Sequence, residues 1–169
     1  TGLATCGLEG ATAYCWGYNG AGALGIGSVD VLPHHTPGAV SGGLSFTALG
    51  TGGGMTCGVT SGRAAYCWGL NTVGQLGDGT LVNHTVPGPV TGGLTFRDLA
   101  PGSAHVCGRT PERFAYCWGR NSKGQLGDGS TADRSTPVRT KSGIVLRLEA
   151  ARDFVSCSGT MQRSCKRNL

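Results

Sequence analysis

An all-β fold made of small repeated sheets is the fold class that the sequence predicts, and three observations predict it. The chain repeats itself at a period close to 50 residues. Each repeat breaks into short extended runs punctuated by Gly and Pro, and no window shows the 3.6-residue apolar period of a helix. Glycine accounts for 32 of the 169 residues, against a usual share of about 7%, which a fold rich in tight turns requires.

The repeat is marked by the tetrapeptide Tyr-Cys-Trp-Gly, which begins at Tyr14, Tyr66 and Tyr116. A further cysteine precedes the cysteine of each copy by nine or ten residues, and a fourth copy begins at Cys157. We therefore divide a single repeat domain, residues 1–169, into units at approximately 6–56, 57–106 and 107–156 and a degenerate terminal hairpin at 157–169.

Each unit contains four short extended segments. Where the second unit runs into the third, we expect them at residues 94–100, 105–109, 114–119 and 138–140. A four-stranded sheet of this size cannot bury its faces alone and must stack on its neighbours, which predicts β-propeller blades of four short antiparallel strands. The strand order reads as three strands, two sets of four and then three, so the chain holds about 3.5 blades, as a partial propeller or a subunit of an assembly.

Charge is unevenly distributed along the chain. Residues 1–96 carry a net charge of −2 and residues 97–169 carry +7, which sum to the total of +5. No run of basic residues is longer than Lys166-Arg167, so nucleic acid is not the expected partner. No stretch of eighteen apolar residues exists either, so we expect no membrane span. The predicted contacts with a protein partner are Arg113, Arg120, Lys123 and Arg134.

One longer motif resembles a known family. The run Cys-x(8–9)-Cys-Trp-Gly-x-Asn-x-x-Gly-Gln-Leu-Gly-Asp-Gly is complete at residues 57–79 and 107–129. It resembles the regulator of chromosome condensation repeat, in particular its cysteine-bearing secreted bacterial and archaeal relatives, and the resemblance implies a β-propeller that is typically seven-bladed. Kelch repeats share the period and the Gly-Gly pairs, but they separate their Tyr from their Trp, whereas Tyr-Cys-Trp is contiguous here. The kelch family is therefore the second-ranked resemblance. The first copy departs from the motif at Ala23 and Ile26.

The eight cysteines are expected to form one local disulfide in each hairpin. Opposed positions on antiparallel strands lie close enough to be bridged, and the repeat makes pairing within each unit the economical arrangement. Zinc binding by the cysteines is the alternative interpretation, but their spacing is not that of a zinc site and no histidine recurs beside every pair. Disulfides imply an oxidising compartment, so the expected location is extracellular or at the cell surface. The predicted pairs are Cys6–Cys15, Cys57–Cys67, Cys107–Cys117 and Cys157–Cys165.

The other repeated residues are expected to serve the structure. The aromatic residues of the tetrapeptide should form the repeat core and pack between blades. Asp78 and Asp128 are expected to cap turns, since one carboxylate per turn makes a poor calcium site. Asn83 begins a glycosylation sequon on a predicted surface loop. The aromatic core residues are Tyr14, Tyr66, Tyr116, Trp16, Trp68 and Trp118.

No constellation in the sequence suggests catalysis. There is no hydrolase elbow, zincin helix, P-loop or convergent acid–base pair, so we expect no enzyme, cofactor, metal or small-molecule substrate. The leading prediction is a non-catalytic extracellular module that binds a protein partner through its blade loops. The resembling family includes a nucleotide exchange factor, a β-lactamase inhibitor and a photoreceptor, so the resemblance does not fix the partner. The alternatives are a structural subunit of a fibre or surface assembly, formed by head-to-tail association of copies, and a secreted enzyme inhibitor.

Overall fold

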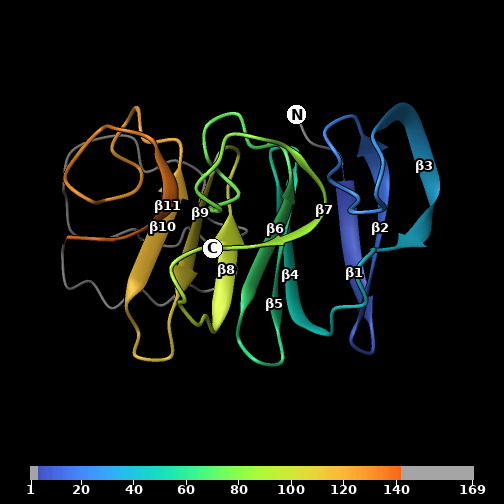
Figure 1. Ribbon diagram of the computed structural model, residues 1–169, viewed down its shortest axis with the longest axis horizontal. Coiled ribbons are helices and arrows are strands. Elements are labelled where there is room, and N and C mark those ends of the chain that lie inside the picture. The colour runs from blue at the N-terminus through green and yellow to red at the C-terminus, as the bar shows by residue number, and fades with distance from the viewer. Residues whose placement is uncertain (1–3, 142–169) are drawn as a thin grey trace, which may run out of the picture.

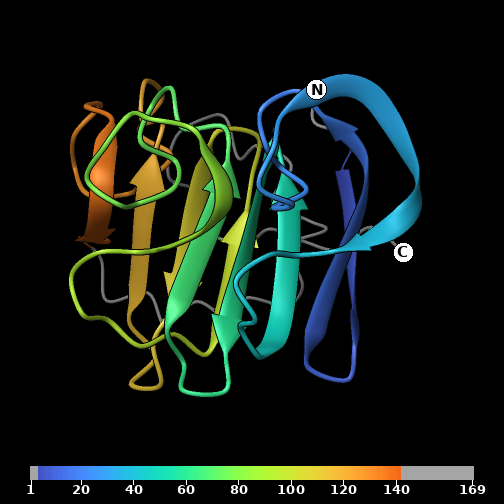
Figure 2. The ribbon, with the colours of Figure 1, turned by 45° about the vertical axis from the view of Figure 1, so that its right-hand side comes forward.

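The computed structural model describes residues 4–141, which form eleven β-strands in three antiparallel sheets, with no helix in this part of the chain. The sheets stand side by side with their strands nearly aligned (Figures 1 and 2). The first sheet contains β1 (Ala4–Glu9), β2 (Thr12–Asn19) and β3 (Asp30–Ala39). The second contains β4 (Phe46–Gly52), β5 (Met55–Thr60), β6 (Ala65–Gly69) and β7 (His84–Pro89). The third contains β8 (Asp98–Pro101), β9 (His105–Arg109), β10 (Ala115–Gly119) and β11 (Arg134–Arg139).

The predicted division into three strands followed by two sets of four is therefore present. Strand β4 contacts both β1 and β8, so the first strands of the sheets meet along one side of the molecule, and β3, β7 and β11 form the opposite edges. Each four-stranded sheet takes its first strand from one repeat unit and the other three from the next. A blade is consequently completed only when two successive units are joined.

The two ends of the sheets carry different connections. The tight turns β1–β2, β5–β6 and β9–β10 lie at the hairpin end, which is at the bottom of Figure 1. The opposite, motif-loop end carries the long connections that contain the repeat motif. These motif loops are residues 20–29, 70–83 and 120–133.

The hydrophobic core lies between neighbouring sheets. Trp68 and Trp118 are fully buried, and each packs with its ring centroid 5.7 Å from that of a phenylalanine, Phe46 and Phe96 respectively. Trp16 is only half-buried. The tryptophans of the second and third sheets thus occupy the inter-blade positions that the sequence predicts for all three.

Two predicted strand boundaries are wrong. The segment expected at residues 138–140 is strand β11, Arg134–Arg139, because its polar start extends an outer edge strand that needs no buried face. The segment expected at 94–100 begins only at Asp98, and Thr95 instead makes an isolated bridge to Ala64. The other two predicted segments agree with β9 and, to within one residue, with β10.

Three of the four predicted disulfides are present in the structure. In each, the two cysteines are direct partners across a hairpin, with Cα atoms 4.1 Å apart. The fourth predicted pair, Cys157–Cys165, lies outside the described residues. The bridged pairs are Cys6–Cys15, Cys57–Cys67 and Cys107–Cys117.

Candidate functional site

A buried asparagine holds each motif loop in shape. In the second sheet, Asn71 is fully buried, and its side-chain oxygen accepts the backbone N–H of Leu76 at 2.9 Å. Its amide group donates to Oδ1 of Asp78 and to the carbonyl of Thr80, both at 3.1 Å. The Asp78 carboxylate also accepts the backbone N–H of Thr80 at 2.8 Å. The loop is therefore fixed from inside, and Asp78 acts as the turn cap that the sequence predicts.

The third sheet repeats this arrangement. Asn121 accepts the backbone N–H of Leu126 at 3.0 Å and donates to Asp128 at 3.2 Å. Asp128 also pairs with Arg134, whose Nε lies 2.8 Å from Oδ2. In the second sheet His84 takes the place of Arg134, with its Nε2 3.0 Å from Oδ2 of Asp78. The exchange of histidine for arginine between copies thus preserves a partner for the same carboxylate.

The first sheet supplies its carboxylate from a different place. Ile26 stands where the motif has aspartate, and the amide of Asn19 donates instead to Asp30, at 3.2 Å, at the start of β3. His34 lies 3.0 Å from Asp30 and opposite Gly17, at the same register as His84 and Arg134. All three sheets therefore combine a buried asparagine, a carboxylate and a histidine or arginine at this end.

These contacts lower the pKa of each carboxyl group below its ordinary value. The His34 and Asn19 side chains lower the pKa of Asp30. For Asp78, burial opposes the shift, but hydrogen bonds from the Thr80 backbone and hydroxyl lower the pKa. For Asp128, the Ser130 hydroxyl and backbone and the Arg134 guanidinium lower the pKa, again against burial. All three groups are thus held as carboxylates with structural partners.

The first and second motif loops are also tied to the next sheet. Gly27 donates its backbone N–H to the carbonyl of Thr85 in β7, and Gly79 donates to the carbonyl of Ser135 in β11, both at 2.9 Å. Because these two loops are each fixed by their own asparagine and by a neighbouring outer strand, the motif loops of the first two sheets are joined to the sheets that follow them.

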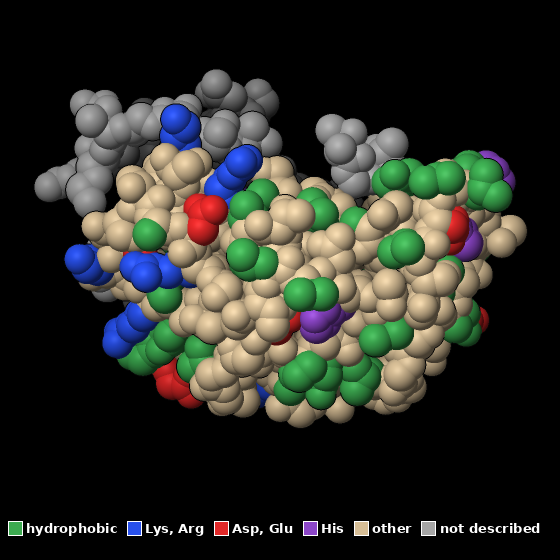
Figure 3. Space-filling model, turned by 45° about the horizontal axis from the view of Figure 1, so that its top comes forward, with side chains coloured by type: hydrophobic (Ala, Val, Ile, Leu, Met, Phe, Trp, Pro, Cys, Tyr) green, Lys and Arg blue, Asp and Glu red, His purple; other side chains and the backbone are tan. Residues whose placement is uncertain are grey.

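Large apolar side chains are exposed at the motif-loop end. Over the first sheet, Val31 and Leu32 are 76% and 73% exposed, and over the second sheet Leu81 and Val82 are 61% and 65% exposed. We call these four residues the apolar tips. In Figure 3, which brings the motif-loop end forward, hydrophobic side chains gather at the upper right and Lys and Arg side chains at the left. The third loop carries Thr131 and Ala132 at the positions of Leu81 and Val82.

The four predicted partner contacts lie at opposite ends of the third sheet and do not form one face. Arg120 and Lys123 are exposed in the third motif loop. Arg113 is exposed at the other end of strand β10, in the β9–β10 turn, because the chain crosses the whole sheet between these positions. Arg134 is paired with Asp128.

Asn83 lies exposed in the second motif loop, where the predicted glycosylation sequon remains a prediction. Its side-chain oxygen accepts the backbone N–H of Asn71 at 2.8 Å. The side-chain nitrogen, to which a glycan would be attached, takes no part in this hydrogen bond. In the third loop, a carboxylate oxygen of Asp133 accepts the backbone N–H of Asn121 at 2.6 Å. The buried asparagines belong to the repeat motif, but their role in holding the loops was not predicted from sequence. The apolar tips were not predicted either, although the difference between residues 81–82 and 131–132 was a visible signal.

Metal sites and membrane-spanning helices are both absent from the described part of the chain. Residues 4–141 contain no group of three or more His, Cys, Asp or Glu side chains placed to hold a metal ion. Within the same residues, no helix is long and apolar enough to cross a membrane.

Comparison with solved structures supports the propeller architecture. The fold is similar to that of Prp20p from Saccharomyces cerevisiae, with a TM-score of 0.70 and 18% identity over 78% of this chain and 34% of that chain. Human WBSCR16 gives a TM-score of 0.72 and 20% identity over 82% and 36%. The ectodomain of the Physcomitrella patens receptor kinase CR4 gives a TM-score of 0.50 and 25% identity over 72% and 28%. The chain thus spans about a third of the length of these proteins.

A family comparison matches the repeats directly. The sequence model of the Regulator of chromosome condensation (RCC1) repeat matches residues 64–108 and 115–158, which together make up more than half of the chain. These stretches contain the Tyr-Cys-Trp-Gly copies and motif loops that build the second and third sheets. The chain therefore belongs to the regulator of chromosome condensation (RCC1) repeat family.

Proposed function

We propose that this chain is part of a non-catalytic extracellular β-propeller that binds a protein partner through its motif-loop end. The observation that carries the proposal is the exposure of the apolar tips, of which Leu81 and Val82 lie on a loop that is fixed from within and Val31 and Leu32 lie at the start of strand β3. Exposing these apolar side chains to water is unfavourable, and burying them in a protein interface is favourable. A rigid loop also loses little conformational entropy when a partner binds.

The extracellular part of the proposal is supported by the three disulfides. Such bonds persist in oxidising compartments and are rare where glutathione keeps thiols reduced. The similarity to a receptor kinase ectodomain, at 25% identity, supports the same location. The solved structure of Prp20p concerns binding to Gsp1p and histones, so propellers of this fold include protein-binding members.

The absence of catalysis is supported by the roles of the ionisable side chains at this end. The carboxylates of Asp30, Asp78 and Asp128 are each engaged by a buried asparagine and by a histidine or an arginine. Groups held in this way stabilise loops and are not poised to exchange protons with a substrate.

The test compares binding by variants of the apolar tips. The immobilised full chain is used to isolate partners from the extracellular proteins of its source, and an isolated partner is then titrated in purified form. Leu81→Thr with Val82→Ala gives the second loop the residues of the third, so the fold should be retained. We expect this double variant to weaken partner binding by about tenfold or more, in line with the loss of a buried apolar anchor.

Leu8→Thr is the matched control, because Leu8 is 37% exposed on β1, near the hairpin end. Its affinity should stay close to that of the unaltered chain. Partner binding that is unchanged by the double variant, or weakened equally by the control, would contradict binding at the motif-loop end.

A structural subunit that associates head to tail is a second candidate, favoured by Trp16. This side chain is half-buried, whereas Trp68 and Trp118 are fully covered by a neighbouring sheet. A second copy stacked on the first sheet would cover Trp16. Sedimentation of the chain and of Trp16→Ser at several concentrations tests this candidate, which predicts oligomers only for the unaltered chain.

A further inference from the structure

A cavity of about 520 Å³ opens at the hairpin end, between the second and third sheets. Its lining includes Thr60 at the end of β5, Ser61 and Arg63 of the β5–β6 turn, Phe96 and Arg97 of the segment before β8, and Pro111 of the β9–β10 turn. We propose that this cavity binds an acidic segment of a protein partner, with Arg63 and Arg97 receiving its carboxylates. It would be a second binding site, at the opposite end of the sheets from the apolar tips.

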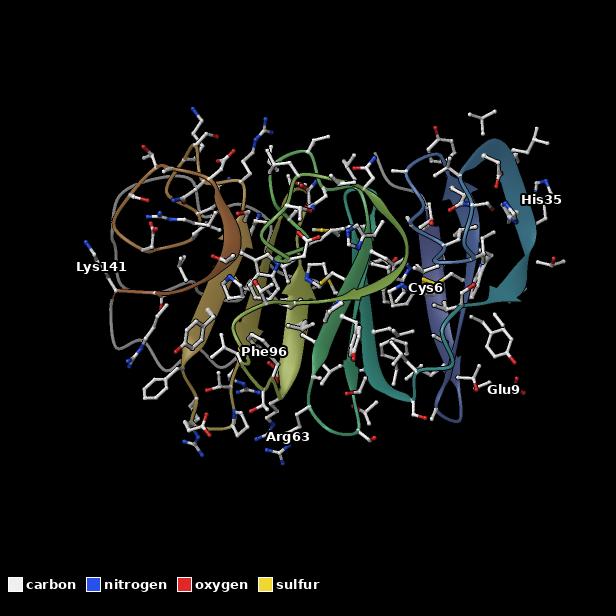
Figure 4. All side chains as sticks on the ribbon, viewed as in Figure 1. Cys6, Glu9, His35, Arg63, Phe96 and Lys141 are labelled. Atoms are coloured by element: carbon white, nitrogen blue, oxygen red, sulfur yellow. A yellow bond between two sulfur atoms is a disulfide. The ribbon has the colours of Figure 1, made fainter. Side chains whose placement is uncertain are left out.

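The cavity is built from backbone that is fixed in place. Phe96 donates its backbone N–H to the carbonyl of Arg63 at 2.8 Å, and the next residue, Arg97, donates to the carbonyl of Arg109 at 2.7 Å. The Phe96 ring is fully buried against Trp118 beneath them. The segment that carries Arg97 is therefore held to both neighbouring hairpins. Figure 4 shows Arg63 at the hairpin end, with Phe96 lying closer to the sheets.

The hairpin end of these two sheets has an excess of positive charge. The carboxylates on the same turns and strand ends are Asp98 and Glu112, of which Asp98 is paired with Arg109. The guanidinium of Arg139 lies 3.8 Å from the centre of the Phe114 ring. Within residues 4–141, neither Arg63 nor Arg97 has a carboxylate within 4.0 Å. The arginines at this end are Arg63, Arg97, Arg109, Arg113 and Arg139.

Glu112 shows that negative charge is stabilised at the rim of the cavity. Its own backbone N–H, the Thr110 hydroxyl and, less strongly, the Arg63 guanidinium lower the pKa of Glu112 below its ordinary value. A carboxylate of a partner that enters the cavity would meet Arg63 and Arg97 directly. The planar guanidinium presents paired donors that match the two oxygens of a carboxylate.

An acidic peptide fits this site better than a nucleic acid. A nucleic acid is bound along a continuous basic track, and a single strand also stacks its bases on exposed aromatic rings. Here Glu112 and Asp98 interrupt the basic surface and the Phe96 ring is buried. The Phe114 ring is partly exposed, but the Arg139 guanidinium lies over it. The cavity volume lies in the range that accommodates a small ligand or a few side chains.

The test measures the fluorescence anisotropy of a labelled hexaglutamate peptide titrated with the full chain at an ionic strength of about 0.15 M, where the Debye length is about 8 Å. The double variant Arg63→Asn, Arg97→Gln removes both charges, and asparagine tolerates the left-handed conformation of residue 63, where φ is +65°. We expect this variant to bind hexaglutamate at least tenfold more weakly. The matched control Arg120→Gln, Lys123→Gln removes two charges at the motif-loop end and should leave the affinity within about twofold, since distant surface charges are screened.

Three results would overturn the proposal. The first is no binding of hexaglutamate beyond that of a hexaglutamine peptide. The second is an equal loss of affinity in both double variants, which would indicate attraction by net charge alone. The third is tighter binding of a six-phosphate oligothymidine that depends on the same two arginines, which would assign the cavity to nucleic acid. Circular dichroism of each variant verifies the fold, and binding through the apolar tips is measured separately, so the two proposals can fail independently.

Discussion

Trp118 donates its indole N–H to the backbone carbonyl of Gln75 in the preceding sheet, at 3.1 Å. Trp68 stands at the same position of the preceding repeat, but its indole nitrogen has no acceptor among the described residues. The difference has a local cause, because the equivalent carbonyl, that of Ala23, accepts the hydroxyl of Thr56 at 2.8 Å. The two inter-sheet boundaries are therefore similar in shape but differ in how their polar groups are satisfied.

This difference predicts unequal effects of the same substitution. Trp118→Phe loses the hydrogen bond and leaves the Gln75 carbonyl unpaired, whereas Trp68→Phe removes a buried N–H that has no acceptor. Both variants lose similar apolar area, so we expect Trp118→Phe to cost about 1 kcal/mol more free energy of unfolding. Urea denaturation followed by far-ultraviolet circular dichroism measures both. Equal losses would show that the indole hydrogen bond contributes nothing to this boundary.

Asn121→Ala should be one of the most damaging substitutions outside the apolar core. It leaves the backbone N–H of Leu126 and the carbonyl of Ser130 without the partner they have in the folded protein. We expect a loss of about 2–4 kcal/mol, since each buried polar group left unpaired costs about 1–3 kcal/mol. Ser122→Ala, at the exposed neighbouring position, is the control and should change the free energy of unfolding by less than about 0.5 kcal/mol. A small effect of Asn121→Ala would mean that water replaces the asparagine in the loop.

The carboxylates of the motif loops predict a loss of stability in acid. The pKa values of Asp30, Asp78 and Asp128 are lowered in the folded chain, so the unfolded chain takes up protons first as the pH falls. Their contribution is complete above about pH 5, beyond the unfolded pKa of about 3.9, and is lost as the pH falls through the folded values. Urea midpoints at pH 6, 4.5, 3.5 and 2.5 should decrease in that order. Asp128→Asn, which no longer titrates, should reduce the slope, and an unchanged slope would exclude Asp128 as a contributor.

Gly53 predicts a sharp steric limit at the turn between β4 and β5. Its φ is +41°, and a Cβ atom there would overlap the carbonyl oxygen of Ser103 in the β8–β9 turn of the neighbouring sheet. Gly53→Ala should therefore cost about 3 kcal/mol or more, because backbone of both sheets must move. Gly42→Ala is a matched control, with φ of +96° and no atom within 4 Å of the added carbon, so it reports backbone strain alone. Equal thermal shifts for the two variants would show that the sheets separate easily at this turn.

Much of the fold could be predicted from the sequence because the repeat is local. Each hairpin carries both of its cysteines, so the period locates the strand pairs and their disulfides together. The start of β11 was missed because Arg134, Ser135 and Thr136 lie on an edge strand and show no apolar alternation.

The site was harder to predict, because it depends on register and on which end of a strand each residue occupies. Asp30 replaces the missing motif carboxylate only because the longer β3 brings it beside Asn19, which no motif comparison reveals. Arg113 and Arg120 are close in sequence but lie at opposite ends of β10. The distribution of charge along the sequence therefore does not show which basic side chains share a surface.

Every disulfide within residues 4–141 joins neighbouring strands of one sheet, and none joins two sheets. Duplication or deletion of one 50-residue segment of the gene would therefore keep each cysteine with its partner. A lineage can gain or lose a blade in a single recombination event without creating an orphan thiol. The same arrangement lets each bridge close during synthesis as soon as nine or ten further residues have left the ribosome, before the rest of the propeller exists.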